Sequence, residues 1–390
     1  MEYVWLRRRD FLAGGRPARG GKGMSGAARR LSILAGALVL LTACGQTTSS
    51  STTSAANAKS AADMGGMAAL IAAAKKEGKL NIIAVPPDWA NYGEIITGFT
   101  AKYGIPIDSA NPNGSSQDEV NAVKQLAGTS RAPDVLDIGK AVTLANLDLY
   151  APYKVQTWND ILDNQKESTG LWVQDYGGYM SIGYDSAKVP AVTSLQDLLG
   201  SGFQGKVALN GDPTKANAAL NGVMMASIAN GGSADDISKG VDFFKQLKQK
   251  GNFVPVQATT ATVKNGTTPV VFDWDYLSAA HGKDVPTWKV FTPSNAILGD
   301  YYNQAINKQA PHPAAARLWM EYLYSDDGQN AWLRGLARPV RMAAMQKSGK
   351  IDSAAAAKLA PVNGKPTFLT DTQATQAKDY LASHWAQAIG

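Results

Sequence analysis

Buried strands alternate with amphipathic helices along the first half of this chain, and this alternation limits its fold more than any other feature. Residues 80–85 have the pattern of a buried strand, and the apolar side chains of residues 92–103 recur at helical spacing. Residues 105–108 and 134–138 repeat the strand pattern, with a helical pattern between them. Strand, helix, strand, helix, strand in this order predicts a parallel sheet with helices on both faces.

A second group of strand and helix patterns occupies the rest of the chain. Residues 206–209 form an apolar strand pattern before a polar loop at 210–217, and residues 270–272 form another before a loop at 273–276. A strongly amphipathic helix is predicted over residues 315–323. Because the chain is long enough for two hydrophobic cores, we expect two domains.

Composition excludes several classes of protein. Of the 38 Lys and Arg residues and the 32 Asp and Glu residues, eight and two fall in residues 1–43, so the two signs balance in the rest of the chain. That balance does not support a basic surface for nucleic acid. Cys44 is the only cysteine, the three histidines lack metal-ligand spacing, and no nucleophile or nucleotide-binding motif occurs. We therefore expect neither an enzyme nor a bound cofactor or metal.

The N-terminus has the composition of a secretory signal. Two arginines precede the apolar run of residues 31–43, which ends in small residues at Cys44. Leu-Thr-Ala-Cys at 41–44 resembles the lipobox of bacterial lipoproteins, whose cysteine receives a lipid. The resemblance implies a signal peptide over residues 1–43, with Met24 as a possible true start, and a lipid anchor on the outer face of the cell membrane. A secreted protein with one buried cysteine is the alternative.

The segment after Cys44 predicts a connection to the first ordered element. Residues 44–62 are rich in Ser, Thr and Ala without apolar periodicity, which is typical of a flexible tether. The first helix is predicted to begin near Met67 and to end at Gly78, because lysines followed by glycine favour a helix C-terminus.

Loops at the carboxyl ends of the predicted strands are the expected binding loops, since open α/β sheets bind their ligands there. They hold many aromatic rings, hydroxyls and carboxylates. The loops are residues 86–92, 111–116, 137–140, 210–217 and 273–276.

Several segments, taken in order, resemble one protein family. They are Ala-Pro-Asp-Val at 132–135, the stretch 176–185, Gly-Lys-Val-Ala-Leu at 205–209, and Tyr-Tyr-Asn-Gln at 301–304 with the segment 310–316 after it. Together they resemble the extracytoplasmic solute-binding proteins of ATP-binding cassette (ABC) importers, and the similarity runs over residues 79–329.

The resemblance implies an α/β fold of the type II periplasmic binding class. Such proteins have two lobes, each a sheet flanked by helices, joined by two crossing strands with the ligand cleft between them. By analogy, lobe one would comprise residues 63–176 and 291–390, and lobe two residues 177–290. The resemblance also implies a monomer that captures a small solute and delivers it to ABC permease subunits in the membrane. The alternatives from other classes are an extracytoplasmic hydrolase or lyase and a structural or adhesion lipoprotein.

Three ligand classes remain open within this family. Trp89 and Tyr92 are similar to the Trp-x-x-Tyr of polyamine-binding proteins, whose rings stack on the methylene chain of the ligand. Tyr301 and Tyr302 resemble the tyrosine pair that ferric-iron-binding relatives use as ligands. Lys215 would suit an anionic solute such as a phosphonate. We place a polyamine-like organic cation first, ferric iron second and an anionic solute third.

The candidate binding residues come from the predicted loops, the crossing strand and the tyrosine pair. For Trp274 and Asp275 the alternative is packing at the end of a strand and in a turn, and Asp273 could cap that turn. Trp89 could instead be a packed residue or a hydrophobic staple, and Tyr176 could pack at the hinge. The basic stretch 334–341 is predicted to be solvated. The candidates are Asp88, Trp89, Tyr92, Ser115, Asp137, Tyr176, Asp212, Thr214, Trp274, Asp275, Tyr301 and Tyr302.

Overall fold

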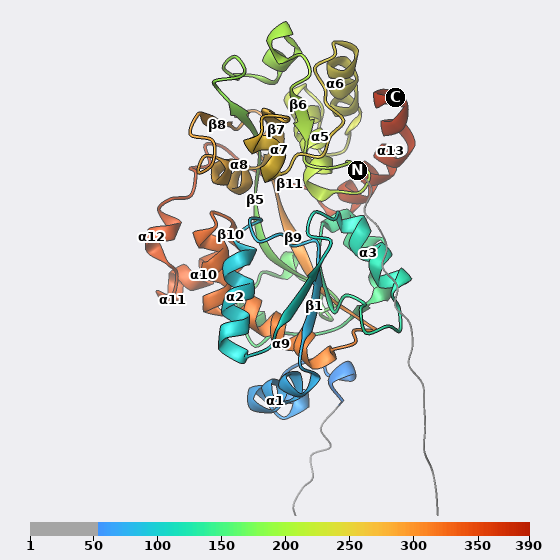
Figure 1. The fold of residues 1–390 in the computed structure, drawn as a ribbon, viewed down its shortest axis with the longest axis vertical. Helices are drawn as coiled ribbons and strands as arrows, with labels where there is room; N and C mark the ends of the chain where they lie inside the picture. The colour runs from blue at the N-terminus through green and yellow to red at the C-terminus, as the bar shows by residue number, and fades with distance from the viewer. Residues whose placement is uncertain (1–53) are drawn as a thin grey trace, which may run out of the picture. The chain divides into compact units, whose positions relative to one another are not determined.

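The long strand β5 (Val173–Asp185) organises the fold, because it pairs with different strands along its length. In the computed structural model, which describes residues 54–390, the first half of β5 runs antiparallel to β9 (Leu298–Asn307). Its second half runs antiparallel to β7 (Val270–Trp274) and to β8 (Trp288–Phe291). Figure 1 shows β5 and β9 side by side. β5 therefore crosses from one lobe to the other, as expected for a strand that joins two lobes.

The sheets are mixed, which corrects the prediction of a parallel sheet. β1 pairs in parallel with β2, and β6 pairs in parallel with β7. β3, however, runs antiparallel to β9, a strand that follows it by more than 150 residues. The remaining strands are β1 (Leu80–Ile83), β2 (Ile107–Ala110), β3 (Val135–Ile138), β4 (Tyr150–Ala151), β6 (Val207–Leu209), β10 (Arg338–Pro339) and β11 (Thr367–Phe368).

Helices cover both lobes, and the predicted first helix is confirmed with its glycine cap at Gly78 in the left-handed conformation. The helices are α1 (Met67–Glu77), α2 (Tyr92–Tyr103), α3 (Ser116–Gln125), α4 (Lys140–Leu144), α5 (Asn217–Ala229), α6 (Ser238–Gln249), α7 (Thr260–Lys264), α8 (Asp275–His281), α9 (Pro313–Leu323), α10 (Asp326–Arg334), α11 (Met342–Ser348), α12 (Ser353–Ala356) and α13 (Asp371–Ile389). No helix among residues 54–390 is both long and apolar enough to cross a bilayer.

The C-terminal helix α13 contacts elements that are far from it in sequence. It packs on α5 and α6, where Trp385 meets the rings of Phe244 and Phe253, and it also contacts α4. Figure 1 shows α13, in red, on the side of α5 and α6. The predicted lobe boundaries place α13 in lobe one and α5 and α6 in lobe two, so these contacts link the two segments. The boundaries themselves stay a prediction.

The first described residues are docked against the folded protein. Two short 3₁₀ helices, η1 (Ala55–Asn57) and η2 (Ala62–Met64), precede α1. The buried guanidinium of Arg317 on α9 donates to the backbone carbonyls of Ala56 and Ala58, at 2.9 and 2.8 Å. The predicted tether, residues 44–62, therefore overlaps a docked segment from residue 54 onward. The signal peptide, Cys44 and the rest of the tether lie outside the described residues.

The basic stretch 334–341 is not solvated throughout, so that prediction is wrong for two of its arginines. Arg338 and Arg341 are buried. The guanidinium of Arg341 donates to the carboxylates of Asp160 and Asp326, and Arg338 donates to Asp275. Each arginine is paired with acids far from it in sequence, which a local pattern of charges does not reveal.

Candidate functional site

The loops after several strands meet at one pocket, as the strand pattern predicts. The pocket is a cavity of about 90 Å³. It receives Asp88 and Trp89 from the loop after β1, Ser115 from the loop before α3, Asp137 from β3 and Tyr302 from β9. Asn210, Asp273, Leu277 and His281 complete it from the lobe that holds β6 and β7. Segments from both lobes therefore enclose the same space.

Asp137 lies in the wall of the pocket with only one of its carboxylate oxygens in hydrogen bonds. Its side chain is 8% exposed. The hydroxyls of Tyr92 and Tyr176 donate to its Oδ2, at 2.9 and 2.8 Å. Its Oδ1 is buried and finds no hydrogen-bond partner within residues 54–390. Buried polar atoms are usually paired, so the unpaired oxygen marks a position where a ligand can supply the partner.

A chain of hydrogen bonds fixes the groups around Asp137. The indole Nε1 of Trp89 donates to the hydroxyl of Tyr176 at 2.7 Å, and the amide of Gln304 donates to the hydroxyl of Tyr92 at 2.9 Å. Each tyrosine hydroxyl therefore accepts one hydrogen bond and donates one to Oδ2 of Asp137. The indole ring of Trp89 is held edge-on to Tyr302, with centroids 5.8 Å apart and planes at 90°.

Backbone strain marks the loop that presents Trp89. Ala84, Ala90 and Asn91 all have positive φ, between 45° and 66°. Such conformations cost free energy in residues other than glycine and occur mainly where the surrounding structure requires them, often at functional sites. Here the strained residues precede α2 and hold Trp89 at the pocket.

Asp273 is the buried carboxylate on the opposite lobe. It lies near the end of β7, and its two oxygens accept from the amide of Asn210 at 2.9 Å and from the backbone N–H of Trp274 at 2.8 Å. Burial raises the pKa of Asp273 to about 7. Unlike Asp137, it therefore has a hydrogen bond on each oxygen.

The pocket is rich in acids. Asp88, Glu119, Asp137 and Asp273 line it, whereas no Lys or Arg does so in the part of the chain that the structure describes. Burial raises the pKa of Asp137 to about 7 and the pKa of Glu119 well above its usual range, and it lowers the pKa of His281. These carboxyls are costly to ionise without a counter-charge, so a cationic ligand would stabilise their charged forms.

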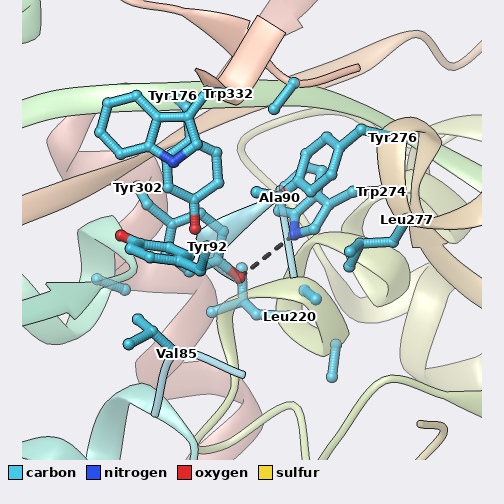
Figure 2. Packing of buried hydrophobic residues seen from close by; sticks show 14 of the residues in the cluster. Val85, Ala90, Tyr92, Tyr176, Leu220, Trp274, Tyr276, Leu277, Tyr302 and Trp332 are labelled. Atoms are coloured by element: carbon cyan, nitrogen blue, oxygen red, sulfur yellow. Dashed lines mark hydrogen bonds between the residues drawn. The ribbon is translucent and has the colours of Figure 1, made fainter. Parts of the chain in front are cut away.

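Aromatic rings pack around Tyr302, which lines the pocket. Figure 2 shows Tyr92, Tyr176, Trp274 and Tyr302 in this layer, with the hydrogen bond from the indole of Trp274 to the hydroxyl of Tyr302 drawn as a dashed line. Tyr176 is stacked on Tyr302, with centroids 5.6 Å apart. These rings give the pocket a rigid, apolar support.

The structure brings five of the predicted binding residues to the pocket wall: Asp88, Trp89, Ser115, Asp137 and Tyr302. Tyr92 and Tyr176 lie one layer behind, in contact with Asp137. Trp274 is buried with its indole on Tyr302. A role in ligand binding stays a prediction for all of them.

The other four predicted residues have partners elsewhere. Asp275 is ion-paired with Arg338 at 2.7 Å, and the ring of Tyr301 is stacked on Phe368. Asp212 accepts from the backbone N–H and hydroxyl of Thr214. It also lies 3.5 Å from the ammonium of Lys215, which is the cation considered for an anionic solute.

Sequence reasoning did not select Asp273, Glu119 or His281, which also line the pocket. Asp273 lies in a predicted loop but is interpreted from the sequence only as a turn cap, whereas Glu119 and His281 lie on helices, α3 and α8, rather than on the loops that follow strands. The carboxylate of Glu119 accepts from the backbone N–H of Asp137 at 2.9 Å. Only the packing of α3 on β3 brings the two acids together, and the sequence carries no signal for it.

Comparison with known proteins gives the family. Residues 140–360, more than half of the chain, match the family of bacterial extracellular solute-binding proteins. The chain therefore belongs to that family, which confirms the predicted class and an extracytoplasmic location. It is a family of binding proteins rather than enzymes, as predicted. No curated protein sequence matches the chain.

Solved structures of two-lobed periplasmic binding proteins share the fold. Iron-bound HitA from Pseudomonas aeruginosa is 20% identical with a TM-score of 0.59, over 80% of this chain and 99% of HitA. AfuA from Actinobacillus pleuropneumoniae, bound to fructose-6-phosphate, is 16% identical with a TM-score of 0.62, over 80% and 98%. AgtB from A. tumefaciens R10, in complex with agropinic acid, is 16% identical with a TM-score of 0.62, over 80% of this chain and 98% of AgtB. These neighbours bind chemically different solutes, so they establish the fold and not the ligand.

Proposed function

We propose that this protein is the substrate-binding component of an ABC importer and that it captures a small organic cation, such as a short polyamine. The observation that carries the proposal is the charge of the pocket. Four carboxyl residues line it, and Lys and Arg are absent from its lining among residues 54–390. Asp137 and Asp273 approach from opposite lobes, which suits a ligand with an amino group near each end.

Aromatic contact supports the same ligand class. The rings of Trp89 and Tyr302 line the pocket and stand at right angles to each other. An ammonium group over an aromatic face gains about 0.5–2 kcal/mol, and methylene groups pack well on such faces. Two rings and several carboxylates together match a cation with an aliphatic body.

The two alternative ligand classes fit the pocket less well. Tyr301 and Tyr302 are neighbours on β9, so their side chains point to opposite faces of the sheet. Tyr302 lines the pocket, whereas Tyr301 is stacked on Phe368. Two phenolates therefore do not meet at one iron. An anionic solute would face four carboxyl groups, and no arginine or lysine of the described residues lines the pocket to receive it.

A ligand screen by thermal unfolding tests the proposal. Bound ligand stabilises the folded state by about 2.7 kcal/mol when its concentration is 100 times Kd. Putrescine and spermidine should raise the melting temperature, and Asp273→Asn should reduce the effect, while Asp212→Asn serves as a matched control outside the pocket. Stabilisation by ferric citrate or methylphosphonate alone would reject the proposal.

We also propose that the protein is a lipoprotein, anchored through Cys44 and acting as a monomer beside its permease. The lipobox-like sequence at 41–44 supports the anchor. Cys44→Ser should release the protein from the membrane fraction into the soluble extracytoplasmic fraction. Membrane association that persists in this variant would contradict the anchor but leave the binding function untouched.

A further inference from the structure

Asp137 differs from every other acid of the pocket in having a free, buried oxygen. The two tyrosine hydroxyls occupy Oδ2, and Oδ1 is without a partner in the described part of the chain. Asp273 has a hydrogen bond on both oxygens, Glu119 accepts from the backbone N–H of Asp137, and Asp88 is exposed. A cation that reached Oδ1 of Asp137 would find a buried carboxylate oxygen without a hydrogen-bond partner among residues 54–390.

From this geometry, and resting on the proposed function, we infer that Asp137 is the residue that receives the ammonium group of the solute, and that it gives up a proton when the solute binds. In the free protein the carboxyl holds its proton below about pH 7. On binding, the O–H bond of the carboxyl breaks, the proton leaves to solvent, and the carboxylate takes the ammonium as its counter-ion. One cationic charge thus replaces another.

Burial without a counter-charge is what favours a proton on Asp137 in the absence of a ligand. Glu119 on α3 and Asp175 on β5 are buried acids beside it, and burial together with the charge of Asp137 raises their pKa values well above the usual range. They are therefore neutral neighbours when Asp137 ionises, and Asp273 lies across the pocket. The remaining titratable neighbours are phenols, which stay neutral at ordinary pH: Tyr92, Tyr176, Tyr276, Tyr302 and Tyr324.

Tyr92 and Tyr176 set the pH at which the exchange occurs. Burial raises the pKa of Asp137, and the hydrogen bonds from the two hydroxyls lower it again, to a value of about 7. They are positioning residues, because they act through Asp137. Removing the hydroxyl of Tyr92 should therefore raise the pKa of Asp137 and move the exchange to higher pH.

Calorimetry with putrescine tests the inference, because the ammonium groups of putrescine stay protonated between pH 5 and pH 8.5. In wild type we expect the affinity to rise at least tenfold per pH unit below pH 7 and to level off above it, because Asp137 releases one proton and Asp273, whose pKa burial also raises to about 7, adds to the release. Titrations at pH 6 in two buffers of different ionisation enthalpy measure the number of protons released. In Asp137→Asn the release should fall by about one proton and the affinity at pH 8 should fall at least a hundredfold.

Three further variants keep the test decisive. Asp273→Asn should bind more weakly but still release the proton. Tyr92→Phe should shift the pH at which the affinity levels off upward, whereas Tyr301→Phe, which removes a hydroxyl outside the pocket, should leave it unchanged. A hydroxyl of merely structural importance would lower stability without moving this pH.

The outcomes separate the inference from the proposed function. Binding without proton release, or proton release that is lost in Asp273→Asn and kept in Asp137→Asn, would overturn the role of Asp137 and leave an organic cation as the ligand. Failure of both putrescine and spermidine to bind at pH 8 would overturn the proposed function, and the inference with it.

Discussion

Two buried aspartates that contact the crossing strand β5 show how this chain treats a charge that it needs for its fold and one that we assign to its ligand. Asp137, which lines the pocket, and Asp275 are both 8% exposed. Asp275 is paired with Arg338 at 2.7 Å, and its other oxygen accepts from the backbone N–H groups of Tyr179 and Tyr276. Asp137 accepts only from tyrosine hydroxyls on one oxygen, and its other oxygen has no partner among residues 54–390. The chain supplies a counter-charge in one case and leaves it to the solute in the other.

The place of the Asp275–Arg338 pair explains its structural role. Arg338 lies on β10, which pairs with β5 at Tyr176 and Gly177. Along this stretch β5 also pairs with β9, so Arg338 belongs to the lobe that holds β9. Asp275 begins α8, directly after β7 in the other lobe. The ion pair therefore connects the two lobes beside the crossing strand. The charge of Asp275 is already neutralised by Arg338, and both of its oxygens are in hydrogen bonds, so it is not available to bind a cationic ligand.

Removal of Arg338 is the strongest test of the comparison. Arg338→Met would leave the buried carboxylate of Asp275 without its counter-charge, so we expect the free energy of unfolding to fall by about 3–5 kcal/mol. Arg334→Met is the matched control, because Arg334 is an exposed arginine whose pairs with Glu94 and Asp352 should contribute only about 0–1 kcal/mol. Denaturant unfolding of the ligand-free protein gives both values. Equal losses in the two variants would mean that Asp275 does not depend on Arg338.

Asp137→Asn should change the pH dependence of stability rather than stability alone. Burial raises the pKa of Asp137 to about 7, whereas an unfolded aspartate titrates near 4. Between these values the folded state holds a proton that the unfolded state has lost, so the contribution of this group is largest below about pH 4 and disappears as the pH rises through 7.

We therefore expect the ligand-free wild type to lose stability between pH 5 and pH 8, on the order of 2 kcal/mol more than Asp137→Asn does. Asparagine resembles the protonated carboxyl, so the variant should fold as the wild type does at low pH. Urea unfolding at several pH values measures the difference. Identical pH profiles would show that Asp137 is ionised without a ligand, and would remove the contrast with Asp275.

The smallest effect is expected at Asp212, which the sequence suggested as a binding residue. Its carboxylate and the ammonium of Lys215 are 43% and 56% exposed, and such pairs contribute roughly 0–1 kcal/mol. Asp212→Asn should therefore change the unfolding free energy by less than about 1 kcal/mol and leave the putrescine affinity within twofold. A large loss of affinity would place Asp212 in the binding site after all.

The strand-end rule predicted much of the site, because it depends only on local patterns. It placed Asp88, Trp89, Ser115 and Asp137 on loops or strand ends that do meet at the pocket. The same rule failed to separate neighbours within one loop. Asp273 reaches the pocket, whereas Asp275, two residues later, pairs with Arg338.

The rest depends on contacts between distant segments. Arg338 follows Asp275 by 63 residues, and β9 pairs with β3 after an even longer separation. The alternating pattern predicts a parallel sheet. It does not reveal that β9, from much later in the sequence, pairs antiparallel with both β3 and β5. Glu119 likewise joins the pocket only through the packing of α3, so neither its burial nor its partner follows from its neighbours in sequence.

The hydrogen bonds from Arg317 to the carbonyls of Ala56 and Ala58 have a consequence for the delivery of solute to the permease. If Cys44 carries a lipid, only the ten residues 44–53 separate the lipid from the docked segment. Fully extended, they span at most about 35 Å. Short tethers of this kind keep two partners at effective concentrations in the millimolar range. A permease in the same membrane would then need only weak affinity for the binding protein. A weakly bound binding protein dissociates quickly and is free to bind another solute molecule.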